Sequence, residues 1–135
     1  MAKYVLDSYA LLAFFRDEPG ADAVEKLLNE AAADKHELYI TSVNAGEVYY
    51  MSYKKDRAAK ANQVWEAMKK FPLHFFDADM ELSFAAAKIK ANHKLSYADA
   101  FAAALTITKK ATLMTGDDEF ESLVDETGFK VKYIS

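Results

Sequence analysis

The sequence predicts an α/β domain whose sheet is mostly parallel. Short apolar segments alternate along the chain with longer segments of helical periodicity, which is the pattern of strands joined by helical crossovers. The chain has 135 residues and shows no composition break, linker or internal repeat. We therefore expect residues 1–135 to form one domain, with helices covering both faces of the sheet.

The predicted strands are short apolar runs. The first, Tyr4-Val5-Leu6, lies almost at the start of the chain. The run around Pro72 is expected at an edge of the sheet, because proline cannot donate a hydrogen bond to a neighbouring strand. The five expected strands cover residues 4–6, 38–41, 71–76, 112–115 and 130–134.

The predicted helices are separated by breaker and capping residues. Pro19 and Gly20 end the first helix, Asp56 and Asp79 are candidate N-caps, and Ser96 opens an alanine-rich helix. The expected helices cover residues 8–15, 21–33, 43–53, 56–69, 79–92 and 96–108, with a short helix near Phe120.

Composition excludes several classes of protein. The chain has no cysteine, which excludes disulfides, thiol catalysis and cysteine-based zinc sites. No uncharged run approaches the length of about 18 residues that a membrane span needs, and Asp7 comes too early for a signal peptide, so we expect a cytoplasmic protein. With 17 basic and 21 acidic residues, the net charge is −4, and a nucleic-acid ligand would need a local basic strip or a bridging cation.

Four acidic residues occupy unusual surroundings. Asp7 directly follows the first strand, and Asp117 follows the strand over residues 112–115. Asp99 is the only charged residue between two distant lysines, in an alanine-rich helix. Glu47 lies in the middle of a helix, on its apolar face, with no lysine four residues away on either side.

Each acidic residue has a structural interpretation beside a functional one. Asp7 and Asp117 can cap the helices that follow them, and Ser96 and Asp99 match the spacing of a capping box. Glu47 resists this interpretation, because a carboxylate on an apolar helix face must be paired, protonated or bound to a cation.

Taken together, the four carboxylates favour a metal site. In parallel α/β folds, ligands bind beyond the carboxyl ends of the strands, where the strand order reverses. Clustered carboxylates repel each other unless a cation neutralises them. Oxygen ligands suit hard cations, so Mg²⁺ or Mn²⁺ is the expected cofactor.

The acidic residues lie within four segments that occur in the order YVLDSYALLAFF, NAGEVYY, LSYADAFAAA and TLMTGDDEF. Together these segments resemble the PIN-domain ribonucleases. They are most similar to the small single-domain members that act as toxins in VapBC toxin–antitoxin pairs. The resemblance runs through nearly the whole chain.

The resemblance implies a three-layer α/β/α sandwich around a mainly parallel five-stranded sheet. It implies that the family's acidic positions, which hold one or two divalent cations, are Asp7, Glu47, Asp99 and Asp117. It gives Ser8 and Thr115 supporting roles in orienting ligands or waters. Because Asp117 is followed by Asp118 and Glu119, which of these three acids reaches the metal stays open.

The implied activity is a Mg²⁺- or Mn²⁺-dependent endoribonuclease that hydrolyses RNA phosphodiester bonds. The implied partners are an RNA substrate, an antitoxin protein and a second copy of the chain. An aromatic content of 13% also favours a homodimer. One alternative is a non-catalytic PIN-like module that binds nucleic acid or protein. A phosphoacceptor receiver domain is disfavoured, because Asp7 has no second acid beside it.

Two basic runs and one aromatic run carry weaker predictions. The basic runs would flank the RNA cleft or simply be solvated; they comprise Lys54, Lys55, Arg57 and Lys60, and Lys88, Lys90, His93 and Lys94. The aromatic run would stack bases or, as we favour, contribute to the core and an interface; it comprises Tyr49, Tyr50, Met51 and Tyr53.

Overall fold

A five-stranded sheet, parallel throughout, forms the middle of the molecule. The computed structural model describes all of residues 1–135. The strand order is β3-β2-β1-β4-β5, and every neighbouring pair is parallel. The strands are β1 (Ala2–Leu6), β2 (His36–Thr41), β3 (Leu73–Phe76), β4 (Thr112–Thr115) and β5 (Val131–Tyr133). All five lie where the sequence predicts them, and the strand beside Pro72 is at an edge.

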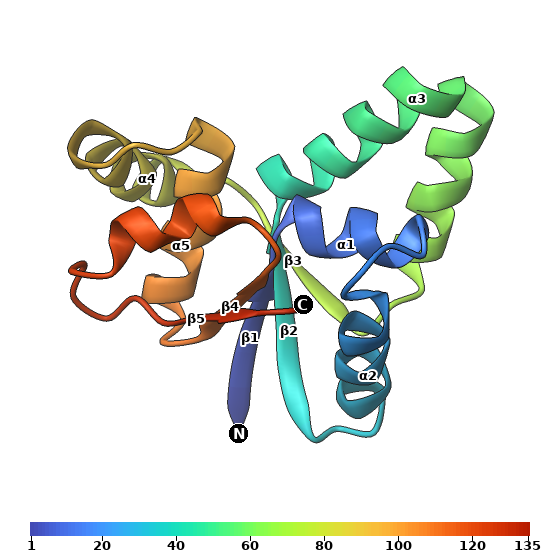
Figure 1. The fold of residues 1–135 in the computed structure, drawn as a ribbon, viewed down its shortest axis with the longest axis horizontal. Helices are drawn as coiled ribbons and strands as arrows, with labels where there is room; N and C mark the ends of the chain where they lie inside the picture. Colours follow the sequence, from blue (N-terminus) through green and yellow to red (C-terminus); the bar gives the residue numbers. More distant parts are fainter.

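Helices cover both faces of the sheet. Figure 1 shows one group of helices on one side of the strands and a second group on the other. The first group is α1 (Ser8–Phe15), α2 (Ala21–Ala32) and α3 (Ser42–Lys69); the second is α4 (Met80–Asn92) and α5 (Tyr97–Thr108). A short 3₁₀ helix, η1 (Asp118–Leu123), follows β4. This arrangement confirms the predicted three-layer sandwich.

A hydrophobic core lies on each face of the sheet, and alternate residues of the same strands pack in the two cores. Leu6 and Met114 pack in the core beneath α1, α2 and α3. Val5 and Leu113 pack in the core beneath α4 and α5. Because successive side chains of a strand point to opposite faces, each central strand contributes to both cores, and its sequence is apolar without alternation.

One helix prediction is only partly correct. The sequence predicts separate helices over residues 43–53 and 56–69, with Asp56 as a cap. In the structure, helical residues run through α3 with a single break at Arg57, where φ is 70° and ψ is −173°. Figure 1 shows the two arms of α3 folding back on each other at this bend. Arginine rarely adopts a positive φ, so no local signal marks the bend at this residue.

The strand order places a ligand position at the end of β1. Strand β1 is bordered by β2 on one side and β4 on the other, so the strand order reverses there. The loops that leave β1 and β4 therefore open beside each other at the carboxyl edge of the sheet. None of the helices combines the length and the apolar character needed to cross a membrane.

Candidate metal centre

A pocket of about 300 Å³ lies where the acidic residues of several elements meet. Its lining includes three of the four predicted acids, together with an acid that the sequence left open. The lining residues are Ser8, Tyr9, Leu12, Glu47, Met51, Ser96, Asp99, Asp117 and Glu119. The fourth predicted acid, Asp7, is not in the lining and is only 1% exposed.

Asp7 is held by hydrogen bonds to both carboxylate oxygens. As the N-cap of α1, it accepts a hydrogen bond from the amide of Ala10 at 2.9 Å through Oδ1. Its Oδ2 accepts a hydrogen bond from the hydroxyl of Thr115. Burial nevertheless raises the pKa of Asp7 from 3.8 to about 7. The predicted capping role is confirmed, and the same side chain lies beside the acidic pocket.

Asp99 lies in the first turn of α5 and is 8% exposed. Ser96 caps this helix by accepting a hydrogen bond from the amide of Asp99 at 3.1 Å, as the sequence predicts. Burial raises the pKa of Asp99 to about 7, and neighbouring acidic side chains raise it in the same direction. A carboxylate in this position favours a cation at its side.

The turn after β4 brings two acids to the pocket. Carboxylate oxygens of Asp99, Asp117 and Glu119 all lie within 4.8 Å of one another. Asp117 accepts a hydrogen bond from the amide of Glu119 at 2.9 Å, and this 3₁₀ turn places both side chains together. Asp118 belongs neither to this group nor to the pocket lining. Of the acids that the sequence left open, Asp117 and Glu119 reach the cluster.

Glu47 is tied to two neighbouring elements. Its Oε1 accepts a hydrogen bond from the hydroxyl of Ser8 at 2.7 Å and lies 3.4 Å from Nδ2 of Asn44. Asn44 is fully buried, and its Nδ2 also donates to the carbonyl oxygen of Ala98 at 3.2 Å. Asn44 therefore joins α3 to the start of α5. No sequence prediction included Asn44, although a polar residue three positions before Glu47 shares its helix face.

The donor set fits a hard divalent cation. The pocket offers carboxylate and hydroxyl oxygens, and no histidine lines it. Mg²⁺ and Mn²⁺ prefer such oxygen ligands, whereas zinc sites generally include nitrogen or sulfur. Burial raises the pKa values of Asp7 and Asp99. No lysine or arginine lines the pocket, so the protein itself places no compensating positive charge there. A bound cation would supply that charge.

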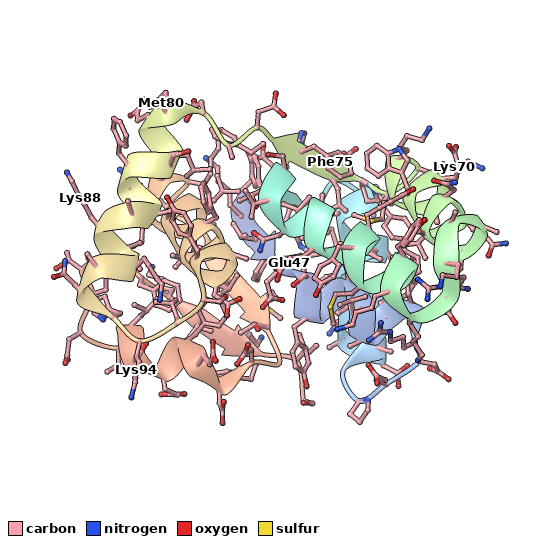
Figure 2. The ribbon with its side chains drawn as sticks, turned by 90° about the horizontal axis from the view of Figure 1, so that it is seen from above. Glu47, Lys70, Phe75, Met80, Lys88 and Lys94 are labelled. Carbon is pink, nitrogen blue, oxygen red and sulfur yellow. The ribbon has the colours of Figure 1, made fainter.

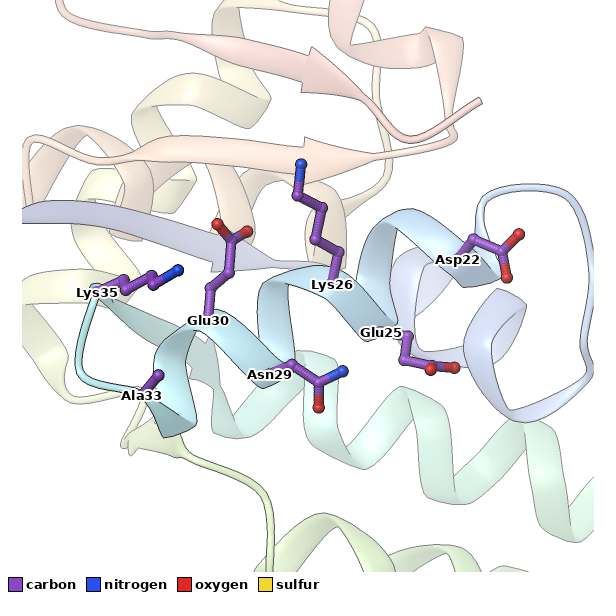
Figure 3. Close-up of a pocket in the computed structure, with 7 residues that line it drawn as sticks. All are labelled: Asp22, Glu25, Lys26, Asn29, Glu30, Ala33 and Lys35. Atoms are coloured by element: carbon purple, nitrogen blue, oxygen red, sulfur yellow. The ribbon is translucent and has the colours of Figure 1, made fainter.

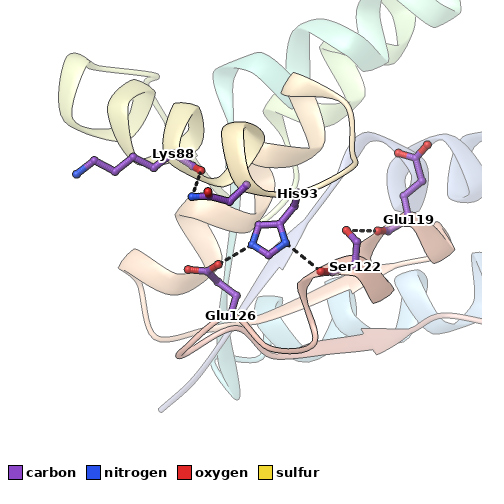
Figure 4. A network of polar contacts seen from close by, with 6 residues as sticks. Lys88, His93, Glu119, Ser122 and Glu126 are labelled. Carbon is purple, nitrogen blue, oxygen red and sulfur yellow. Dashed lines mark hydrogen bonds and ion pairs between the residues drawn. The ribbon is translucent and has the colours of Figure 1, made fainter.

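The side chain of His93 contacts the segment that follows Asp117 and Glu119. Its Nδ1 lies 3.0 Å from the carbonyl oxygen of Ser122, and its Nε2 lies 2.8 Å from Oε2 of Glu126 (Figure 4). The hydroxyl of Ser122 donates to the carbonyl oxygen of Glu119 at 3.0 Å. The ring thus connects the end of α4 to η1. His93 is engaged in this contact, whereas the lysines around it in the sequence are exposed.

Most side chains of the two basic runs and of the aromatic run are exposed. Figure 2 shows Glu47 between Lys88 and Lys94 on one side of the molecule and Lys70 on the other. The basic side chains at the bend of α3, Lys54, Lys55, Arg57 and Lys60, are all exposed. The favoured core assignment is wrong for Tyr49, Tyr50 and Tyr53, which are 36%, 55% and 44% exposed. The hydroxyl of Tyr49 donates a hydrogen bond to Oδ1 of Asn62, in the second arm of α3, at 2.7 Å.

A second pocket, of about 420 Å³, lies on α2 and is unrelated to this cluster (Figure 3). Its charged residues have both signs and come mainly from the exposed face of one helix. They are Asp22, Glu25, Lys26, Glu30 and Lys35. Mixed charges of this kind are typical of a solvated helix surface.

Solved structures with the same fold span almost the whole chain. A DNA-bound VapBC from Salmonella typhimurium has a TM-score of 0.76 and 17% identity, and the match covers 100% of both chains. VapBC2 from Rickettsia felis, bound to a promoter DNA fragment, has a TM-score of 0.75 and 17% identity over 97% of this chain and 98% of that one. VapC20 from Mycobacterium tuberculosis, described as a toxin that cleaves the sarcin–ricin loop, has a TM-score of 0.71 and 14% identity over 90% and 95% of the two chains.

No curated protein sequence matches the chain. At identities this low, the structural neighbours, which are VapC toxins of VapBC complexes, show a shared fold. The family model of the PIN domain matches residues 4–126, which include all the acidic residues of the pocket and Asp7. The chain therefore belongs to the PIN domain family.

Proposed function

We propose that the protein is a Mg²⁺- or Mn²⁺-dependent endoribonuclease and the toxin of a toxin–antitoxin pair. The observation that carries this proposal is the approach of the Asp99, Asp117 and Glu119 carboxylates to within 4.8 Å, in a pocket that Glu47 also lines. The PIN family assignment and the place of the pocket at the carboxyl ends of parallel strands support it. Residues 1–135 would act as one PIN-like domain.

The residues divide into those that hold the cation and those that hold the carboxylates. In this proposal, the cation is bound by Asp99, Asp117 and Glu119. Asp7 and Glu47 add further negative charge beside it. Ser8 and Thr115 act as supporting residues, because each donates a hydrogen bond to one of these carboxylates; the pairs are Ser8 with Glu47 and Thr115 with Asp7.

The bound cation would activate a water for attack on phosphorus and neutralise charge on the phosphoryl oxygens. The protein carries a net charge of −4, and the pocket itself is acidic, so a phosphate would be repelled without the cation. The carboxylates therefore have a second effect: RNA can approach the pocket only when the cation is in place.

We propose an antitoxin and a second copy of the chain as partners. Solved VapBC structures of this fold are complexes of a toxin with an antitoxin, which supports the first. Exposed aromatic side chains, including the tyrosines of α3, support the second. Cytoplasmic location stays a prediction from the sequence.

The test is cleavage of an end-labelled single-stranded RNA by purified protein with Mn²⁺, with Mg²⁺ and with a chelator. We expect cleavage only with a cation, and loss of cleavage in Asp99→Asn. The matched control is Asp79→Asn, because Asp79 is an exposed N-cap of α4 outside the pocket. Cleavage in chelator, or an Asp99→Asn variant as active as Asp79→Asn, would contradict the proposal. RNA binding without cleavage would favour the non-catalytic module.

A further inference from the structure

Tyr9 places an exposed aromatic ring at the rim of the acidic pocket. It lies in the first turn of α1 and lines the pocket beside Glu47, Asp99 and Asp117. Tyr9 is 46% exposed. Its hydroxyl makes no hydrogen bond within the protein that would account for its position. The ring therefore presents an apolar surface to solvent among carboxylates.

The ring of Tyr9 packs closely against Gly116. A Cβ atom added at Gly116 would lie 2.2 Å from Cε1 and 2.7 Å from Cδ1 of Tyr9, so only glycine leaves room for the ring edge. The backbone of Gly116 immediately precedes Asp117, and Ser8, which precedes Tyr9, donates to Glu47. The ring is thus packed against the turn that leads into Asp117, and this contact limits its freedom before a ligand binds. An aromatic surface that is already ordered loses little freedom when a ligand stacks on it.

The charge of the site explains why such a surface would be useful. Phosphate contacts give most nucleic-acid binding proteins their affinity, but this pocket is lined by four carboxylates. Stacking of a base on an aromatic ring does not depend on positive charge. It also tolerates any base, because every base has a π face.

We propose that Tyr9 is a binding residue for an unpaired nucleobase of single-stranded RNA, next to the phosphate that is cleaved. This inference rests on the proposed ribonuclease function and extends it to the substrate class. A base within a duplex is already stacked on its neighbours, so the subsite selects single-stranded segments. Tyr9 contributes affinity and position, and the carboxylates carry out the chemistry.

The kinetic test compares Tyr9→Leu, which keeps an apolar side chain without the ring, with Tyr9→Phe, which keeps the ring. Stacking contributes to binding of substrate and transition state alike, so KM should rise about 5-fold or more in Tyr9→Leu with kcat nearly unchanged. Tyr9→Phe should behave as wild type. The matched control is Tyr53→Leu, because Tyr53 is 44% exposed but lies outside the pocket.

Three kinetic outcomes would count against the inference. The first is an unchanged KM in Tyr9→Leu in a protein that cleaves RNA. The second is an equal loss in Tyr9→Phe and Tyr9→Leu, which would assign the effect to the hydroxyl. A rise in KM for Tyr53→Leu equal to that for Tyr9→Leu would likewise count against a specific subsite.

A binding test that needs no cleavage separates this inference from the proposed function. In a chain carrying Trp65→Phe and Tyr9→Trp, the only indole is at the pocket rim. With Ca²⁺ present, oligoadenylate RNA should quench its fluorescence, and an RNA duplex of equal length should not. Quenching in a protein that cleaves no RNA with Mg²⁺ or with Mn²⁺ would support the subsite and count against the ribonuclease.

Other ligands of this surface would give different results. Equal quenching by AMP and by oligoadenylate would overturn an RNA subsite in favour of a free-nucleotide site. A single-stranded DNA oligonucleotide of the same length is the further probe. Equal quenching by this DNA would extend the subsite to single strands of both kinds and overturn its restriction to RNA. No quenching by any nucleotide, with a change of oligomeric state in Tyr9→Leu, would assign the ring to a protein contact and overturn the inference.

Discussion

The hydroxyl of Thr115 donates a hydrogen bond to Oδ2 of Asp7, which joins the ends of two neighbouring strands through residues 108 positions apart in the chain. The same hydroxyl oxygen accepts a hydrogen bond from the amide of Asp117 at 2.9 Å. Thr115 therefore links the most deeply buried carboxylate of the site to the turn that carries Asp117 and Glu119. The acidic residues of the site therefore form one connected group.

Replacing Thr115 with valine should destabilise the protein. Thr115→Val keeps the shape of the side chain but leaves one oxygen of a buried carboxylate without its donor, which costs about 1–3 kcal/mol of unfolding free energy. Urea unfolding at neutral pH measures the change. The control is Thr106→Val, because the buried Thr106 hydroxyl donates to a helix carbonyl, that of Ala102. If the unfolding free energy falls as much in Thr106→Val as in Thr115→Val, the hydrogen bond to Asp7 contributes no more than an ordinary buried hydrogen bond.

The stability of the metal-free protein should fall as pH rises. Burial raises the pKa of Asp7 from 3.8 to about 7, and burial raises the pKa of Asp99 to about 7 as well. At pH values between 3.8 and about 7, the folded state binds more protons than the unfolded state. The contribution of these protonated carboxyl groups to the unfolding free energy is therefore complete below pH 3.8 and is lost as the pH rises through about 7. In chelator, the unfolding free energy should therefore be lower at about pH 8 than at about pH 5.

Substitution of the titrating group provides the check on this pH effect. Asp7→Asn keeps the size of the side chain and an oxygen that can cap α1, but removes the charge, so its unfolding free energy should depend less steeply on pH. Asp79→Asn, which changes an exposed cap outside the pocket, should keep the wild-type dependence. Parallel profiles for wild type and Asp7→Asn would show that Asp7 does not titrate in this window.

Loss of His93 should loosen the acidic turn. In His93→Ala, the contacts to Glu126 and to the Ser122 carbonyl are removed, which should lower the unfolding free energy by about 1–2 kcal/mol. The turn that carries Asp117 and Glu119 should then be less ordered, so kcat for RNA should fall while Tyr9-dependent binding stays. The comparison is His74→Ala, because His74 is an exposed residue of β3. Equal kcat in both variants would exclude a positioning role for His93.

The protein should be a homodimer in the micromolar range. In the monomer, the side chains of Tyr50, Trp65 and Phe84 are 55%, 36% and 58% exposed. Large exposed apolar side chains of this kind favour contact with a second protein chain. Sedimentation velocity at several concentrations measures the mass. A single monomeric species at every concentration would contradict the prediction.

Most of the fold was predictable because its signals are local. The apolar runs before Asp7 and Asp117 could only be buried strands, and Pro72 indicated an edge. Ser96 and Asp79 marked helix starts that the structure confirms. Each of these features depends on residues that are adjacent in the chain, so it can be predicted from the sequence alone.

The features that escaped prediction depend on contacts between distant segments. The buried Asn44 has its role because the carbonyl of Ala98 lies opposite it across the fold. Glu119 reaches the cluster only because the 3₁₀ turn reverses the chain after Asp117. The bend at Arg57 needs a backbone conformation that arginine disfavours, so tertiary packing must impose it.

The central claim is that the acidic residues form one divalent-cation site, and thermal melting with chelator and with excess Mn²⁺ tests it most directly. At about 100 times its Kd, a cation that binds only the folded state adds about 2.7 kcal/mol, which should raise the Tm of wild type by about 5–15 °C. Asp99→Asn should show a smaller rise and should melt above wild type in chelator, because a buried charge is gone, whereas Asp79→Asn should respond to Mn²⁺ as wild type does. An unchanged Tm of wild type with Mn²⁺, or an equal rise in Asp99→Asn, would contradict the claim.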